Sequence, residues 1–213
     1  MIDSEFLTEL KRFTEKKWSS LTIDPNIYGF QFQRGTRWMP GLPDKQIADY
    51  EDVLGTKFPD DFRIFLGAMN GTDLPTLNVF GSTGVPQRQS PGVYSYPRDV
   101  EVVKQLIEVV EEDRDDVTLD LASQGFHLPA QANLVPVCGH CYVVCTRKLN
   151  TTAVLSIVVH EVDAIVFGYS LRDYLTKEFL SASPNSQVRL PLSQHNENRD
   201  QFRTSASGKE FCK

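Results

Sequence analysis

The chain has 213 residues, 40% of them hydrophobic, which is enough to bury the core of one ordinary domain. Its formal net charge of -6 excludes the concentrated basic surface that nucleic-acid binding needs, and instead favours a basic protein partner. The acidic N-terminal segment does not have the pattern of a secretory signal, and no apolar run approaches the ~18 residues of a membrane span, so we expect a soluble, cytoplasmic protein.

Two amphipathic helices are predicted in the first quarter of the chain. Apolar side chains recur at close to helical spacing over residues 4–18, with Ser4 as the expected N-cap. A second helix is predicted to start at Pro43, a residue favoured at a first helical position, and to end at Gly55, which suits a left-handed C-terminal residue. Residues 22–41 show no regular period and predict an irregular connection.

The third predicted helix is the best specified. Pro59 opens it, and Asp60 and Asp61 lie where carboxylates favour the N-terminal end of the helix dipole. Asn70-Gly71 is expected to close it. Its apolar stripe, which we expect to face the core, consists of Phe62, Phe65, Leu66 and Met69.

A long irregular segment then precedes a fourth helix. Residues 72–97 are rich in Gly, Pro, Ser and Thr and contain short extended pieces at 77–80 and 93–96. Asp99 is expected to cap the fourth helix, whose apolar face points to the core. The helix is predicted to run into a solvated acidic cluster: Glu111, Glu112, Asp113, Asp115 and Asp116.

The remaining third of the chain predicts strands, one helix and a tail. Ser170, with Asp173 three residues later, resembles a capping box and starts a helix that ends near Leu180. Residues 181–213 have few apolar side chains and are predicted to be a disordered C-terminal tail. The β-branched runs predict short antiparallel strands at 134–138, 142–145, 153–159 and 164–167. The expected fold is therefore a single α+β domain over residues 1–180, with a mixed or mainly antiparallel sheet flanked by helices.

Two blocks of this sequence resemble the SUKH superfamily, in particular the branch that includes fungal cell-wall assembly regulators and bacterial immunity proteins. The first block is Leu-Gly-Thr-Lys-Phe-Pro-Asp-Asp-Phe at 54–62, followed by Phe65-Leu66 and Asn70-Gly71. The second begins with Leu-Val-Pro-Val at 134–137 and Gly-His-Cys-Tyr at 139–142, and continues to Phe179. The resemblance implies an α+β fold and a non-enzymatic protein that neutralises a cognate toxin, often a nuclease, by stoichiometric binding. It also implies an alternative role, that of a regulatory binding module in cell-wall assembly or signalling.

A second alternative, a zinc or redox protein, depends on the cysteines. Cys138 and Cys141 have the spacing of a redox motif, and Cys145 with His140 or His160 could complete a zinc set. However, a β-hairpin turning at Gly-His would put the first two cysteines on either side of a tight turn, and a redox motif of this kind should open a helix. We therefore predict structural cysteines and no metal or cofactor. The isolated histidines likewise predict no catalytic site.

The acidic cluster has two interpretations. It can be an ordinary solvated helix end, or it can be the partner-binding surface of an inhibitor whose target carries a basic, phosphate-binding face. In the second case Glu111, Glu112, Asp113, Asp115 and Asp116 accelerate association by electrostatic steering.

Overall fold

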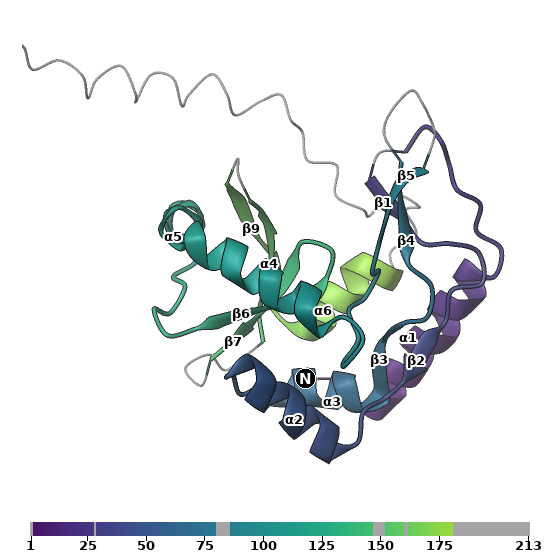
Figure 1. Ribbon diagram of the computed structural model, residues 1–213, viewed down its shortest axis with the longest axis horizontal. Coiled ribbons are helices and arrows are strands. Elements are labelled where there is room, and N and C mark those ends of the chain that lie inside the picture. Colours follow the sequence, from purple (N-terminus) through teal and green to yellow (C-terminus); the bar gives the residue numbers. More distant parts are fainter. Residues whose placement is uncertain (1, 28, 80–85, 147–151, 160–161, 181–213) are drawn as a thin grey trace, which may run out of the picture.

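A four-stranded antiparallel sheet lies between two layers of helices (Figure 1). The computed structural model describes residues 2–27, 29–79, 86–146, 152–159 and 162–180. Successive strands pair with each other, so that the sheet is a simple meander. Its strands are β6 (Asn133–Cys138), β7 (Cys141–Cys145), β8 (Val154–Val158) and β9 (Asp163–Gly168). The predicted α+β class and the four predicted strands are confirmed, with no boundary shifted by more than one residue.

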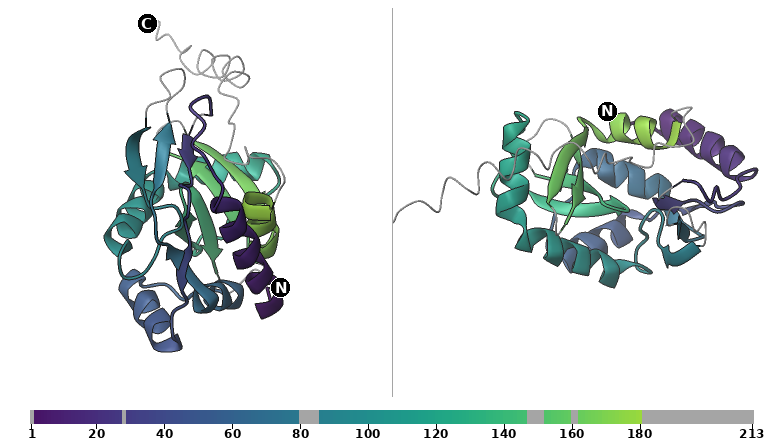
Figure 2. Two further views of the ribbon diagram at one scale, coloured as in Figure 1. Left: turned by 90° about the vertical axis from the view of Figure 1, so that its right-hand side faces the viewer. Right: turned by 90° about the horizontal axis from the view of Figure 1, so that it is seen from above.

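The two faces of this sheet belong to two hydrophobic clusters, because neighbouring side chains of a strand point to opposite faces. Val135, Val143 and Cys145 belong to the cluster that contains the buried apolar side chains of four helices. These are α1 (Ser4–Trp18), α2 (Asp44–Leu54), α3 (Asp60–Ala68) and α6 (Leu171–Leu175). Leu134 and Val144 belong to the cluster formed with the fourth and fifth helices. Those two helices are α4 (Val100–Glu112) and α5 (Arg114–Ser123), and Figure 2 shows them on the opposite side of the sheet from α1 and α6.

The helices of the first layer follow the predicted pattern. In α3, Phe62, Phe65 and Leu66 are each at most 2% exposed, so the predicted core stripe is confirmed. The N-cap of α1 is Asp3 rather than Ser4, because the Asp3 carboxylate accepts a hydrogen bond from the backbone N–H of Phe6. The elements of this layer are α1 (Ser4–Trp18), α2 (Asp44–Leu54), α3 (Asp60–Ala68), α6 (Leu171–Leu175) and the π-helical turn η2 (Thr176–Leu180) that continues α6.

The connection between α2 and α3 is held by a buried carboxylate. Glu51 accepts a hydrogen bond from the backbone N–H of Phe58 at 3.0 Å and forms ion pairs with Lys57 and Arg63. Burial opposes the charge of this group, but the hydrogen bonds prevail and hold the pKa of Glu51 below its ordinary value. Gly55 ends α2 with a φ of 63°, the left-handed conformation expected from the sequence.

Short strands lie beside the helices. A three-stranded sheet contains β1 (Gly29–Gln31), β4 (Thr76–Val79) and β5 (Pro86–Ser90), and β2 (Trp38–Pro40) pairs with β3 (Met69–Thr72). All of these pairings are antiparallel. The predicted piece at 77–80 corresponds to β4, whereas only Val93 of the piece at 93–96 forms a bridge, to Cys138.

The prediction that Asn70-Gly71 closes α3 was wrong. The helix ends at Ala68, and both residues lie within β3. The side-chain amide of Asn70 accepts a hydrogen bond from the backbone N–H of Tyr96 at 2.9 Å and donates one to its carbonyl at 2.7 Å. Gly71 packs so closely on the same segment that a Cβ would lie 2.6 Å from the Cβ of Ser95. The pair therefore fastens a strand to the chain that precedes α4.

The predicted C-terminal tail, residues 181–213, lies outside the described residues, as does His160. In the described part of the chain, no helix is both long and apolar enough to cross a membrane.

Candidate functional site

The predicted acidic cluster lies at a junction between two helices. The fourth helix was expected to run into the whole cluster, but α4 ends at Glu112, and α5 begins at Arg114 after the single non-helical residue Asp113. Figures 1 and 2 show that α5 turns away from the direction of α4 and covers the far end of the same sheet face. The sequence did not reveal α5, because only Val117 and Leu121 of its ten residues are buried.

Arg114, in the middle of the acidic run, joins the junction to the rest of the fold. One nitrogen of its guanidinium group forms an ion pair with Glu111, and the other donates a hydrogen bond to the carbonyl of Ala132 at 2.7 Å. Only 20% of the Arg114 side chain is exposed, so its charge is directed inward. Arg114 therefore neutralises Glu111 and leaves Glu112, Asp115 and Asp116 to face solvent.

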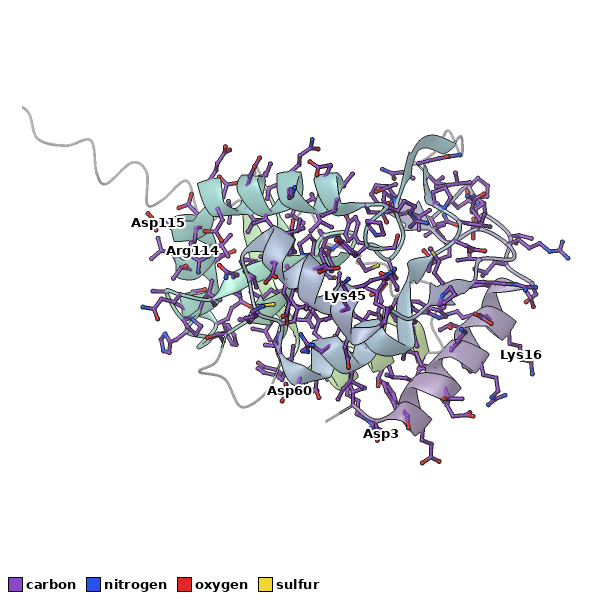
Figure 3. All side chains as sticks on the ribbon, turned by 60° about the horizontal axis from the view of Figure 1, so that its bottom comes forward. Asp3, Lys16, Lys45, Asp60, Arg114 and Asp115 are labelled. Carbon is purple, nitrogen blue, oxygen red and sulfur yellow. The ribbon has the colours of Figure 1, made fainter. Side chains whose placement is uncertain are left out.

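The five predicted residues are thus not equivalent. Glu112, Asp115 and Asp116 are exposed and form no ion pair with any residue that the structure describes. Glu111 is exposed but paired with Arg114, and Asp113 is only partly exposed. Figure 3 shows Asp115 beside Arg114 at one end of the molecule. The three exposed carboxylates, called the acidic surface below, are Glu112, Asp115 and Asp116.

An apolar side chain adjoins this acidic surface. Leu119 is 68% exposed, and it follows Asp115 by four residues and Asp116 by three on α5. Residues at these spacings are neighbours on one face of a helix. The surface therefore presents a leucine next to two carboxylates, so that a partner docking on this face of α5 would meet both an apolar side chain and negative charge.

A second group of carboxylates lies where α2 and α3 begin. Asp44, Asp60 and Asp61 line a shallow depression, together with Ile64. Asp61 accepts a hydrogen bond from the backbone N–H of Ile2 at 3.3 Å, which connects α3 to the start of the chain. These carboxylates stand at helix N-termini, where the helix dipole stabilises them, so their positions follow from helix stability.

The cysteine motif forms the hairpin expected from the sequence. Cys138 and Cys141 are partners across the turn between β6 and β7, and Gly139 adopts a φ of 52° in that turn. All three cysteines of β6 and β7 are free thiols. The hydroxyl of Tyr94 donates a hydrogen bond to the carbonyl of Gly139 at 2.9 Å, which fixes the turn.

Burial makes these thiols poor nucleophiles. It raises the pKa of Cys138, Cys141 and Cys145 well above the ordinary value, so the thiolate that both metal binding and redox attack require is disfavoured. Burial also lowers the pKa of His140, whose Nε2 has no hydrogen-bond partner among the described residues. Within the described ranges, His, Cys, Asp and Glu side chains do not gather in groups of three or more that could hold a metal ion.

Two charged residues that the sequence analysis passed over have defined structural environments. The first is Arg114, which stands in the middle of the acidic run. The second is Glu178, which follows Tyr174 by four residues and so interrupts the apolar face of the last helix. The sequence alone could have marked Glu178, because it is a charged residue on an otherwise apolar helix face. Such a residue needs a polar partner or access to water.

Comparison of the chain with protein-family models, with curated proteins and with solved structures finds no match.

Proposed function

We propose that this chain is a non-enzymatic binding protein of the immunity type, which neutralises a basic toxin domain by forming a stoichiometric complex in the cytoplasm. The observation that carries the proposal is the acidic surface at the α4–α5 junction. Its three carboxylates have no ion pair among the described residues, and an exposed leucine stands beside them. The resemblance of two sequence blocks to SUKH proteins supports the same proposal.

The position of the acidic residues along α4 supports a role outside folding. Glu111 and Glu112 occupy the last turn of α4, which contains no basic residue, and this end of a helix dipole is negative. Negative side chains there disfavour the helix by ~0.3–1 kcal/mol each when they are not compensated. Arg114 compensates Glu111, whereas the charge of Glu112 has no such ion pair among the described residues. Glu112 therefore opposes helix stability, and a contribution to partner binding would explain why a glutamate stands at this position.

The physical role of the surface is to attract and orient a basic partner. Exposed charges without neighbouring counter-charges produce a field that extends about 8–10 Å at moderate ionic strength. A toxin that holds nucleic acid needs a basic surface for the phosphates, so a complementary acidic surface both speeds encounter and covers the toxin's binding face. Leu119 then supplies apolar contact within the polar rim.

The proposal is tested with the protein encoded by the gene immediately upstream, the expected position of the cognate toxin. Expression of that protein alone should stop growth, and co-expression of this chain should restore it. The purified proteins should form a complex of fixed stoichiometry, measured by light scattering and titration calorimetry. Growth rescue at a small fraction of the toxin's concentration would indicate turnover and contradict a stoichiometric inhibitor. A harmless neighbour that nevertheless binds would favour the regulatory alternative.

A further inference from the structure

One edge of the four-stranded sheet is formed by β9, which pairs with β8 on one side and, among the described residues, with no strand on the other (Figure 1). Its residues 164–168, Ala-Ile-Val-Phe-Gly, are uncharged, include two β-branched side chains and contain no proline. An exposed strand of this kind is a template for pairing with another chain, and native proteins protect such edges. The partners of the backbone groups along β9 therefore decide whether this edge can bind a further strand.

At the start of β9, side chains of α5 take the place of a fifth strand. The backbone N–H of Ala164 donates a hydrogen bond to a carboxylate oxygen of Asp120 at 3.1 Å, and the amide of Gln124 donates one to the carbonyl of Ala164 at 2.7 Å. The same amide donates to the carbonyl of Asp120 at 3.1 Å, which holds Gln124 against its own helix. Ala164 thus has both of the hydrogen bonds that a neighbouring strand would supply.

At the other end of β9, side chains of α6 and η2 occupy the edge. The register with β8 shifts so that Phe167 is an extra residue, and its carbonyl accepts a hydrogen bond from Nζ of Lys177 at 3.0 Å. The backbone N–H of Tyr169 donates to the carboxylate of Asp173 at 3.1 Å. Lys177 and Asp173 also form an ion pair at 2.8 Å. Bulges and lysines are two of the means by which proteins prevent pairing at a sheet edge.

Between these two ends, Val166 is the open position. It pairs with Leu155 two residues beyond Ala164, on a regular part of the ladder, so its backbone N–H and carbonyl point to the same edge as those of Ala164. Neither group has a partner outside the sheet among the described residues. One open residue offers two hydrogen bonds, which is too few to hold a strand of the usual length of about five or six residues.

We infer that Asp120, Gln124 and Lys177 act as a clasp on β9 that keeps this edge from pairing with the β9 of a second copy. A second copy is the partner because two β9 strands can meet antiparallel about a two-fold axis, with the same backbone groups and the same uncharged side chains on each side. Once released, Ala164 would present its N–H and carbonyl to the other copy together with those of Val166. The clasp is independent of the acidic surface, although α5 contributes to both.

Light scattering on the full chain tests the clasp through the oligomeric state. The variant Asp120→Ala with Gln124→Ala, called the clasp variant, should self-associate about tenfold or more strongly than the wild type, because it frees a further pair of backbone groups on each copy. The matched control, Glu108→Ala with Ser123→Ala, removes the same charge from exposed positions of α4 and α5 that do not bond β9. It should behave like the wild type. A folded clasp variant that associates no more strongly than this control would overturn the proposal.

Blocking the edge distinguishes pairing through β9 from non-specific association. Val166→Pro removes the backbone N–H that points to the open edge and that β8 does not use. Added to the clasp variant, it should return self-association to the level of the wild type. Circular dichroism and melting temperature report whether each variant is folded. Persistent association of the folded triple variant would place the contact elsewhere and contradict the assignment to β9.

A milder change tests the clasp if the double substitution unfolds the protein. Gln124→Glu keeps the size of the side chain but replaces the donor amide, so that a carboxylate oxygen faces the carbonyl of Ala164. Self-association should again exceed that of the wild type, by a smaller factor. Hydrogen exchange locates the contact: the amide of Val166 should become protected as the concentration of this variant increases, whereas that of Ile165, which points to β8, should change little. Exchange at Val166 that is independent of concentration would overturn the proposal.

Discussion

Helices α3 and α4 each carry a pair of adjacent acidic residues, but at opposite ends. Asp60 and Asp61 open α3, where the positive end of the helix dipole stabilises them. Glu111 and Glu112 close α4, where the dipole disfavours them. The first pair is therefore explained by folding alone. The second pair is not. It adjoins Asp115 and Asp116, which stand in the first turn of α5 and are stabilised there by its dipole in the same way as Asp60 and Asp61. Position along a helix therefore singles out Glu111 and Glu112 as the carboxylates in this comparison that helix stability does not explain.

The two regions also differ in burial. The apolar stripe of α3 is completely enclosed between the sheet and neighbouring helices, and Phe62 and Phe65 stack on each other with centroids 6.2 Å apart. Beside the α4–α5 junction, Leu119 is 68% exposed. The stripe of α3 thus contributes to the core, although Ile64 on the other face of that helix is 42% exposed, whereas the junction presents the more exposed Leu119 to solvent. Three predictions test how the α3 region and the α4–α5 junction differ in burial and in the role of their carboxylates.

The largest expected effect is on stability. Phe65→Ala should lower the free energy of unfolding by about 3–5 kcal/mol, because it leaves a cavity in a fully buried cluster. Phe62→Ala and Leu66→Ala should lower it by similar amounts, about 2–5 kcal/mol. Leu119→Ala, the matched control at the junction, should change it by less than about 0.5 kcal/mol. Urea denaturation measures all four values. If Phe65→Ala and Leu119→Ala had similar effects, the two regions would not differ as described.

The residues that the sequence revealed are those with strong local patterns. Pro59 followed by two aspartates and an aromatic stripe identifies α3 on its own, and Gly55 identifies the end of α2. The β-branched runs likewise identify the meander of β6 to β9. In each case the local preference agrees with the tertiary contacts, so a single sequence was sufficient.

Where the sequence failed, the deciding contacts are distant along the chain. The end of α3 is set by Asn70 and Gly71 packing on Tyr96 and Ser95, which no local rule contains. Arg114 could be noticed among the acids, but its bond to Ala132 depends on the fold. Lys17 and Glu178 line one pocket only because the two ends of the described chain, α1 and η2, come together. Such features become visible only in three dimensions.

A moderate effect is expected on association with a basic partner. Replacing Glu112 with Gln and Asp115 and Asp116 with Asn should slow association several-fold at low salt, because it removes the steering field of the acidic surface. Dissociation should change less, and the difference should shrink as salt shortens the Debye length. Extending the change to Glu111 and Asp113 should add less, since Arg114 already neutralises Glu111.

The matched control removes three exposed carboxylates from the other acidic region. The triple variant Asp44→Asn, Asp49→Asn and Asp60→Asn alters the net charge equally, but at α2 and α3. Stopped-flow or surface-plasmon measurements with the toxin domain give the rates. If both triple variants slowed association equally, only the net charge would matter, and the α4–α5 junction would lose its assignment as the interface.

The smallest expected effect is the most direct test of the dipole comparison. Asp60→Asn should lower the free energy of unfolding by ~0.3–1 kcal/mol, whereas Glu112→Gln should raise it by ~0.3–1 kcal/mol, because the two carboxylates stand at opposite ends of a helix dipole. Both side chains are exposed, and neither forms an ion pair with a described residue, so helix dipoles are the main difference between the two sites. The start of α5 directly after Asp113 reduces the rise expected for Glu112→Gln, which places it at the lower end of the range. The opposite signs should be clearest at low ionic strength and should diminish in high salt. Urea denaturation at two salt concentrations measures both quantities. If Glu112→Gln destabilised the protein, Glu112 would have a structural role at the junction. That role alone would account for its position, without an interface.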